Sequence, residues 1–116
     1  MSYDDDAAQR EGDRKIVETL IAHGDPLTKA RPVDHWVHFG LASARDRFLS
    51  DTDALGFRAT DVHDDGNEPN PFCACVSRVD HVDLDSIHRV VMTLVATAKR
   101  HGGDYDGWEC PVEVAN

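Results

Sequence analysis

The hydrophobic positions of this 116-residue chain first follow a helical period. Between residues 7 and 23, apolar side chains recur at i, i+1, i+4 and i+5, which predicts an amphipathic helix. The stripe consists of Ile16, Val17, Leu20 and Ile21. A glycine and a proline, Gly24 and Pro26, then end the helix.

The period changes to strict alternation in the segment PVDHWVHF, residues 32–39. Its β-branched and aromatic content predicts a strand with two different faces. One face carries Val33, His35, Val37 and Phe39. The other carries Asp34, Trp36 and His38.

Residues 44–55 return to a helical pattern. Ser43 and Asp46 have the spacing of a capping box, so we expect them to close the start of this helix. Gly56 suits the position just after its end, where a left-handed backbone conformation is common.

A hairpin follows. Residues 57–63 and 72–79 read as strands, and the segment between them, DDGNEPNP, is rich in turn-forming residues. Cys73 and Cys75 share one face of the second strand. We therefore expect residues 64–71 to form the loop that joins two antiparallel strands.

The last two elements are a helix, capped by Asp83 or Asp85 and ended by Gly102, and a strand over residues 105–114. Without the first helix the order is βαββαβ. The sequence predicts an α+β, ferredoxin-like βαββαβ sandwich, with an additional N-terminal helix and a four-stranded antiparallel sheet. We expect one domain over residues 7–116, preceded by a flexible acidic tail at 1–6.

Charge narrows the classes of partner. The chain has 22 Asp and Glu against 12 Lys and Arg, a formal net charge of −10. Nucleic-acid affinity comes mostly from Lys and Arg at phosphates, so this composition argues against direct nucleic-acid binding. It favours a protein partner with a basic segment, although acidity alone also keeps a protein in solution.

Three further features of the sequence indicate where in the cell the protein resides. Three cysteines, an acidic N-terminus and the absence of a long apolar run predict no disulfide scaffold, no secretory leader and no membrane helix. We expect a soluble cytoplasmic protein with reduced thiols.

Metal ligands are present but poorly spaced. His35 and His38 lie on opposite faces of their strand, and no pair of zinc-type spacings occurs. A four-ligand set drawn from neighbouring strands remains conceivable. It would comprise Cys73, Cys75, His35 and Cys110. The simpler interpretation is two small thiols, buried or half-buried in a strand, and we predict neither a metal nor a cofactor.

Catalytic motifs are absent: the chain has no nucleophile elbow and no phosphate loop. Asp61 with His63, and Asp80 with His81, could form acid–base pairs, but carboxylates beside histidines are ordinary at solvated strand ends. We predict that the protein is not an enzyme. The alternative is a small metal-dependent or acid–base enzyme. It would use Asp61, His63, Cys73 and Cys75.

The segment GGDYDGWE, residues 102–109, combines glycines, aromatics and acids. Gly107 within a strand indicates a bulge or a close backbone approach. In a regular strand Trp108 would share the open sheet face with Trp36, and two tryptophans ringed by acids would anchor a partner. Tyr105 or Trp108 could instead anchor the strand in the core.

These residues resemble a known family. The segments PVDHWVHF and ALGF, and above all Tyr105-Asp106-Gly107-Trp108, are similar to the regulator of ribonuclease activity B family over about residues 14–113. Its best-understood members are small acidic bacterial proteins that bind ribonuclease E and inhibit RNA cleavage without being enzymes. Longer members continue into an acidic tail, whereas this sequence ends at Asn116.

The resemblance implies a ferredoxin-like fold, in agreement with the fold predicted from the order of helices and strands. It also implies a non-enzymatic, protein-binding regulator of RNA turnover whose partner is ribonuclease E. Our candidate contact residues are Trp36, Tyr105, Asp106 and Trp108. The alternative is a short relative that serves as a generic interaction domain or forms a homodimer through the open sheet face.

Overall fold

The computed structural model describes residues 6–114 and contains the seven predicted elements in the predicted order. The elements are α1 (Asp6–Ala22), β1 (Arg31–Phe39), α2 (Ala42–Ala54), β2 (Arg58–Asp64), β3 (Phe72–Asp80), α3 (Leu84–Arg100) and β4 (Asp104–Glu109).

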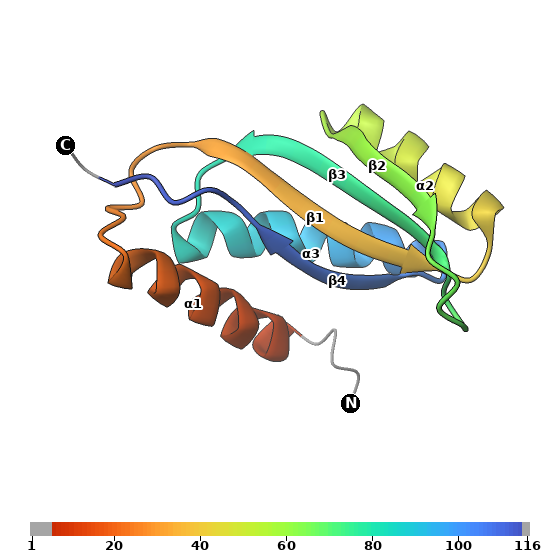
Figure 1. The fold of residues 1–116 in the computed structure, drawn as a ribbon, viewed down its shortest axis with the longest axis horizontal. Coiled ribbons are helices and arrows are strands. Elements are labelled where there is room, and N and C mark those ends of the chain that lie inside the picture. The colour runs from red at the N-terminus through yellow and green to blue at the C-terminus, as the bar shows by residue number, and fades with distance from the viewer. Residues whose placement is uncertain (1–5, 115–116) are drawn as a thin grey trace.

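The four strands form one antiparallel sheet in the order β2-β3-β1-β4. Helices α2 and α3 lie against one face of this sheet, and α1 packs beside α3 (Figure 1). The predicted ferredoxin-like fold with an added N-terminal helix is therefore confirmed. The additional helix extends the helical layer and leaves the other sheet face uncovered.

The core lies between the sheet and the helices. The inward side chains of β1, Val33, Val37 and Phe39, are fully buried, as are Val91 and Leu94 of α3. The alternation of β1 thus has the predicted phase. Each buried aliphatic or aromatic side chain contributes about 1.5–3 kcal/mol relative to an exposed one, so this layer supplies much of the fold's stability.

Helix α1 is attached through a buried carboxylate. Asp13 is only 2% exposed. One of its oxygens accepts a hydrogen bond of 3.0 Å from Nε1 of Trp108, and the other accepts one of 2.8 Å from Nδ1 of His88. The carboxylate therefore joins α1 to both β4 and α3.

A second buried pair holds the segment after β4. Arg31 and Asp25 form a bidentate ion pair, which lowers the pKa of the Asp25 carboxyl well below its usual range. Arg31 also donates to the carbonyl of Pro111, and Asp25 accepts from the backbone N–H of Glu113. Residues 110–114 follow this pair rather than the sheet.

Three local expectations need correction. The last strand ends at Glu109 rather than at 114, because Pro111 has no N–H for a ladder and the segment bonds to the Asp25–Arg31 pair. Ser43 does not cap α2, since the helix begins at Ala42, two residues earlier than expected, with Leu41 at its N-cap and no side-chain cap. Asp6 belongs to α1, and the rest of the expected tail lies outside the described residues.

Replacing Asp13 by Ala should lower the free energy of unfolding by about 3 kcal/mol, because the buried indole N–H of Trp108 and the imidazole of His88 each lose a partner. Urea unfolding followed by circular dichroism measures the change. Asp53→Ala, at an exposed position of α2, is the matched control and should shift stability by no more than about 0.5 kcal/mol. Equal effects of the two variants would contradict the role of Asp13.

Two glycines should respond oppositely to Ala. A Cβ at Gly103 would lie 2.3 Å from Cε1 of Phe39, whose fully buried ring cannot yield, so Gly103→Ala should destabilise by at least about 1–3 kcal/mol. Gly12 lies exposed within α1 with open space around it, so Gly12→Ala should stabilise by about 1 kcal/mol. Thermal unfolding of both variants tests the pair, and a stable Gly103→Ala protein would refute the predicted clash.

Candidate interaction surface

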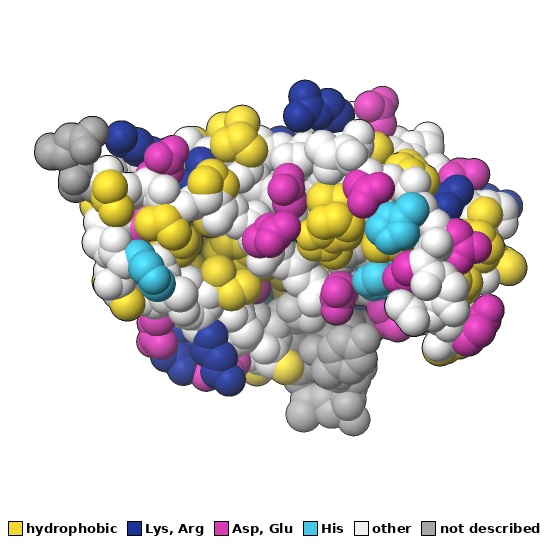
Figure 2. All heavy atoms as spheres, viewed as in Figure 1, with side chains coloured by type: hydrophobic (Ala, Val, Ile, Leu, Met, Phe, Trp, Pro, Cys, Tyr) yellow, Lys and Arg dark blue, Asp and Glu magenta, His cyan; other side chains and the backbone are white. Residues whose placement is uncertain are grey.

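The uncovered face of the sheet carries an unusual mixture of side chains. Asp34, Trp36 and His38 of β1 point to it, as the partly exposed positions of β1 indicate. Strand pairing places Cys75 opposite Trp36 and Cys73 opposite His38 on the same face. Figure 2 shows this face, with hydrophobic side chains near its centre and carboxylates and histidines gathered around and beside them.

A bulge in β4 decides which of its side chains reach this face. Trp36 pairs with Gly107 but Val37 pairs with Tyr105, so Asp106 is the extra residue. Gly107 has φ +151°, a conformation that side chains rarely adopt. The extra residue reverses the alternation, and Tyr105 and Trp108 both turn inward. The predicted bulge is confirmed.

The four candidate contact residues are thereby separated. Trp36 is partly exposed and Asp106 is exposed on the open side. Tyr105 and Trp108 are 4% and 6% exposed and belong to the core. The interpretation in which Tyr105 or Trp108 anchors the strand in the core is confirmed. The alternative, in which Trp36 and Trp108 share the open face, is wrong because it requires a strand without a bulge. A dimer that buries both tryptophans between its subunits is not supported either, because Trp108 is already buried in the core of its own chain.

Acidic residues surround the position of Trp36. The carboxylates on this face or at its rim are Asp34, Asp61, Asp65, Asp104, Asp106 and Glu109. Among the strand residues, Arg58 is the one Lys or Arg that the pairing places here. The face therefore has a strongly negative potential, which attracts and orients cationic groups.

The two strand thiols lie beneath this surface. Cys73 and Cys75 are each 2% exposed, and both are unpaired. Burial, reinforced by Asp65 and Asp61, raises the pKa of Cys73 to about 11, and burial also raises the pKa of Cys75. In the absence of a bound ion both thiols are thus protonated near neutral pH. Their burial agrees with the simpler sequence interpretation.

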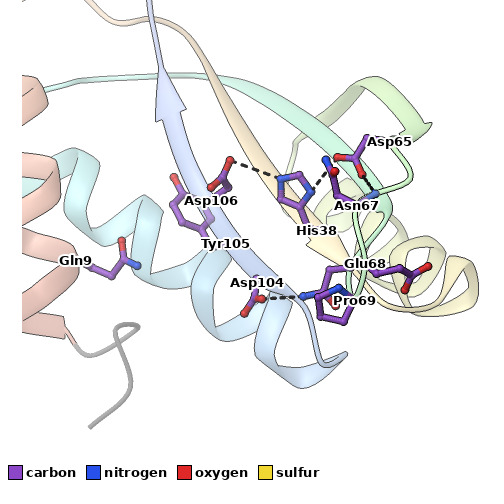
Figure 3. Close-up of a pocket in the computed structure, with 10 residues that line it drawn as sticks. Gln9, His38, Asp65, Asn67, Glu68, Pro69, Asp104, Tyr105 and Asp106 are labelled. Atoms are coloured by element: carbon purple, nitrogen blue, oxygen red, sulfur yellow. Dashed lines mark hydrogen bonds and ion pairs between the residues drawn. The ribbon is translucent and has the colours of Figure 1, made fainter.

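A cavity of about 370 Å³ opens at one end of the face. The loop at residues 65–70 forms one wall, and His38, Asp104 and Asp106 form much of the other (Figure 3). The side-chain amide of Asn70 donates to Asp104 over 2.8 Å and so ties the loop to β4. The turn-rich loop predicted from the sequence therefore shapes this cavity at the end of the open face.

Comparison with known proteins identifies the family. The sequence model for "Regulator of ribonuclease activity B" matches residues 10–110. This chain belongs to that family. A Regulator of ribonuclease activity B from Pseudoalteromonas atlantica is 28% identical over 112 residues, which cover 93% of this chain and 94% of the relative. One from Shewanella amazonensis is 30% identical over 107 residues, which cover 87% and 73%.

In this member of the regulator of ribonuclease activity B family, the suspected four-ligand metal set is not assembled. His35 points to the helices and is fully buried, whereas Cys73 and Cys75 lie on the opposite face. The ring nitrogen Nδ1 of His35 instead forms a hydrogen bond of 2.8 Å with the Tyr105 hydroxyl. His35 is therefore a core residue that positions Tyr105.

The suspected acid–base pair of β2 is assembled, but in solvent. Nδ1 of His63 lies 3.2 Å from Asp61, and the two side chains are 42% and 47% exposed. All seven residues of β2 are exposed at this edge of the sheet. Such an exposed ion pair contributes little to the stability of the fold. Both side chains are open to solvent, so the pair does not form an enclosed site from which water is excluded. Asp80, the other suspected acid, receives two hydrogen bonds from Arg78.

Sequence reasoning missed Asp13, although a signal was available. Asp13 lies four residues before Val17 and seven before Leu20, and these are the buried positions of α1. An acid in register with an apolar stripe indicates a buried carboxylate with partners.

No helix among residues 6–114 is long and apolar enough to cross a membrane.

His35 should make stability depend on pH. Burial, aided by Arg78, lowers its pKa from 6.5 to about 3, so between these values the unfolded chain binds a proton that the folded chain does not. Stability is therefore complete above pH 6.5 and falls as the pH drops toward 3, by about 1.4 kcal/mol per pH unit from this residue.

Denaturant unfolding of wild type and His35→Gln between pH 7 and pH 5 measures this slope, because the variant has no imidazole to titrate. We expect the variant to be less stable at neutral pH but to lose less stability on acidification. Parallel curves for the two proteins would contradict the buried, neutral histidine.

Proposed function

We propose that this protein is a non-enzymatic regulator that binds an RNA-degrading enzyme of the ribonuclease E type and lowers its cleavage of RNA. Membership of a family named for regulation of ribonuclease activity supports the general role. The finer proposal concerns the binding surface. It is the open face of the sheet, with Trp36 as anchor and Asp106 at its edge.

One observation carries this assignment: an aromatic side chain lies partly exposed on a sheet face that the described helices leave uncovered, surrounded by carboxylates. Exposed Trp in such a setting is a frequent energetic centre of protein interfaces. The negative surroundings favour a partner segment rich in Arg and Lys, and they disfavour RNA itself.

The physical mechanism follows from these groups. A basic segment of the enzyme would be steered toward the face by its charge, and an Arg side chain could then stack on the Trp36 ring. Asp34, Asp106 and Glu109 would accept its hydrogen bonds. Because basic segments of an RNA-degrading enzyme also hold RNA phosphates, occupying one would reduce RNA binding and hence cleavage.

The first test combines purified protein with ribonuclease E and measures both binding and the rate of RNA cleavage. We expect a complex whose affinity falls as salt is raised, together with slower cleavage. A cleavage rate that stays constant while no complex forms would refute the proposed function.

Truncation of Trp36 should identify the surface. Loss of a central aromatic anchor typically costs about 2 kcal/mol or more, so Trp36→Ala should weaken binding about thirtyfold while the protein stays folded. Ile21→Ala is the matched control, since Ile21 is a 53% exposed apolar side chain on α1. Isothermal titration calorimetry measures both variants.

The outcomes separate the alternatives. Equal binding by the Trp36 and Ile21 variants would exclude the open face as the contact surface. If Trp36→Ala instead converts a dimer to a monomer in sedimentation experiments, without a change in affinity for the enzyme, the face joins two copies of this chain.

A further inference from the structure

Three different kinds of metal ligand converge at the end of the open face. His38 comes from β1, Asp65 follows β2 and Cys73 belongs to β3, and one donor atom from each lies within 4.8 Å of the other two. Nδ1 of His38 lies 3.8 Å from Oδ2 of Asp65. Strand pairing places Cys73 directly across from His38.

These separations are close to those of a metal centre. In a tetrahedral zinc site with bonds of about 2.0–2.3 Å, neighbouring donor atoms lie about 3.3–3.8 Å apart. The His38–Asp65 distance of 3.8 Å already meets this spacing. The upper limit of 4.8 Å for the cluster exceeds it by about 1 Å, which small side-chain rotations can supply.

The second nitrogen of His38 has the partner that a metal-bound imidazole needs. Nε2 lies 3.5 Å from Oδ2 of Asp106, the extra residue of the β4 bulge (Figure 3). Histidines that bind metals through one nitrogen usually donate the other N–H to a carboxylate, which fixes the ring and its tautomer. Asp106 can orient His38 so that Nδ1 presents its lone pair toward Asp65.

The cluster is also accessible. His38, Asp65 and Asp106 line the cavity of about 370 Å³ that opens to solvent. Cys73 lies buried below, so an ion entering between His38 and Asp65 would meet its Sγ at the inner side. Asp61 adds negative charge beside the thiol. The site thus offers an entry path and a potential that attracts cations.

We propose that His38, Asp65 and Cys73 bind a divalent ion of the zinc class, with Asp106 as the residue that orients His38. Thiolate and imidazole ligands select zinc over magnesium or calcium, which prefer oxygen donors. Three protein ligands leave a fourth position for water or for a side chain of a partner. This replaces the sequence-based prediction of no metal, which could not foresee three ligands from three segments.

Zinc binding tests the proposal without reference to any ribonuclease. Untagged, chelator-treated protein is dialysed against Zn²⁺ and the bound metal is measured by mass spectrometry. We expect one zinc per chain. Replacement by Co²⁺ should add an absorption band from the cobalt–thiolate bond. Protein that retains no zinc above a blank would overturn the proposal.

Variants locate the ion. His38→Ala and Cys73→Ser should each weaken zinc binding by more than about tenfold, and Asp106→Asn by about tenfold. Cys75→Ser is the matched control, because Cys75 is equally buried on the same face but lies outside the cluster. It should bind zinc as wild type does.

Circular dichroism establishes that each variant is folded. If Cys73→Ser does not fold, Asp65→Asn and His38→Asn, at less buried positions, provide the test in its place. Zinc binding that survives all the ligand substitutions, or that Cys75→Ser reduces as much as Cys73→Ser, would place the metal elsewhere and refute the site.

Discussion

The carboxylate of Asp13 is the interaction on which the arrangement of this fold depends. The β4 bulge turns Trp108 toward the helices, and a buried indole N–H needs an acceptor. Asp13 supplies it from α1 and at the same time accepts from His88 of α3. One side chain thus connects β4 to both α1 and α3. Because Tyr105 and Trp108 of β4 are both buried on the helical side of the sheet, neither aromatic side chain covers the opposite face.

The same bulge explains which side-chain positions can be predicted from the sequence and which cannot. Periodicity was sufficient for all seven elements and for the face assignments of β1, since apolar and polar residues alternate there without interruption. In β4 a single extra residue, Asp106, reverses the alternation, and residue spacing alone cannot show where that reversal occurs. The sequence therefore leaves both a core position and a position on the open face possible for Trp108. The cluster of His38, Asp65 and Cys73 has no signature in the sequence, because strand pairing rather than spacing along the chain brings its members together.

The open face combines two kinds of recognition that differ in range. Its carboxylates act over roughly a Debye length of about 8–10 Å and favour any basic surface. In the proposed complex, Trp36 would act only on contact and would therefore distinguish one basic partner from another. The proposed metal site lies at the end of this face, where the loop at 65–70 meets β4. An ion there would reduce the local negative charge and could contribute a coordination position to the interface, so that occupancy and partner binding would influence each other.

The exposed strand β2 has a consequence for self-association. A sheet edge with free backbone groups can pair with the edge of another molecule and begin aggregation. Here every residue of β2 faces solvent, and the strand carries Arg58, Asp61, His63 and Asp64 together with an irregularity after Ala59. Charges and a local distortion of this kind discourage strand addition. The sheet can therefore expose the aromatic side chain of Trp36 on its open face while the β2 edge resists pairing with a second copy of the chain.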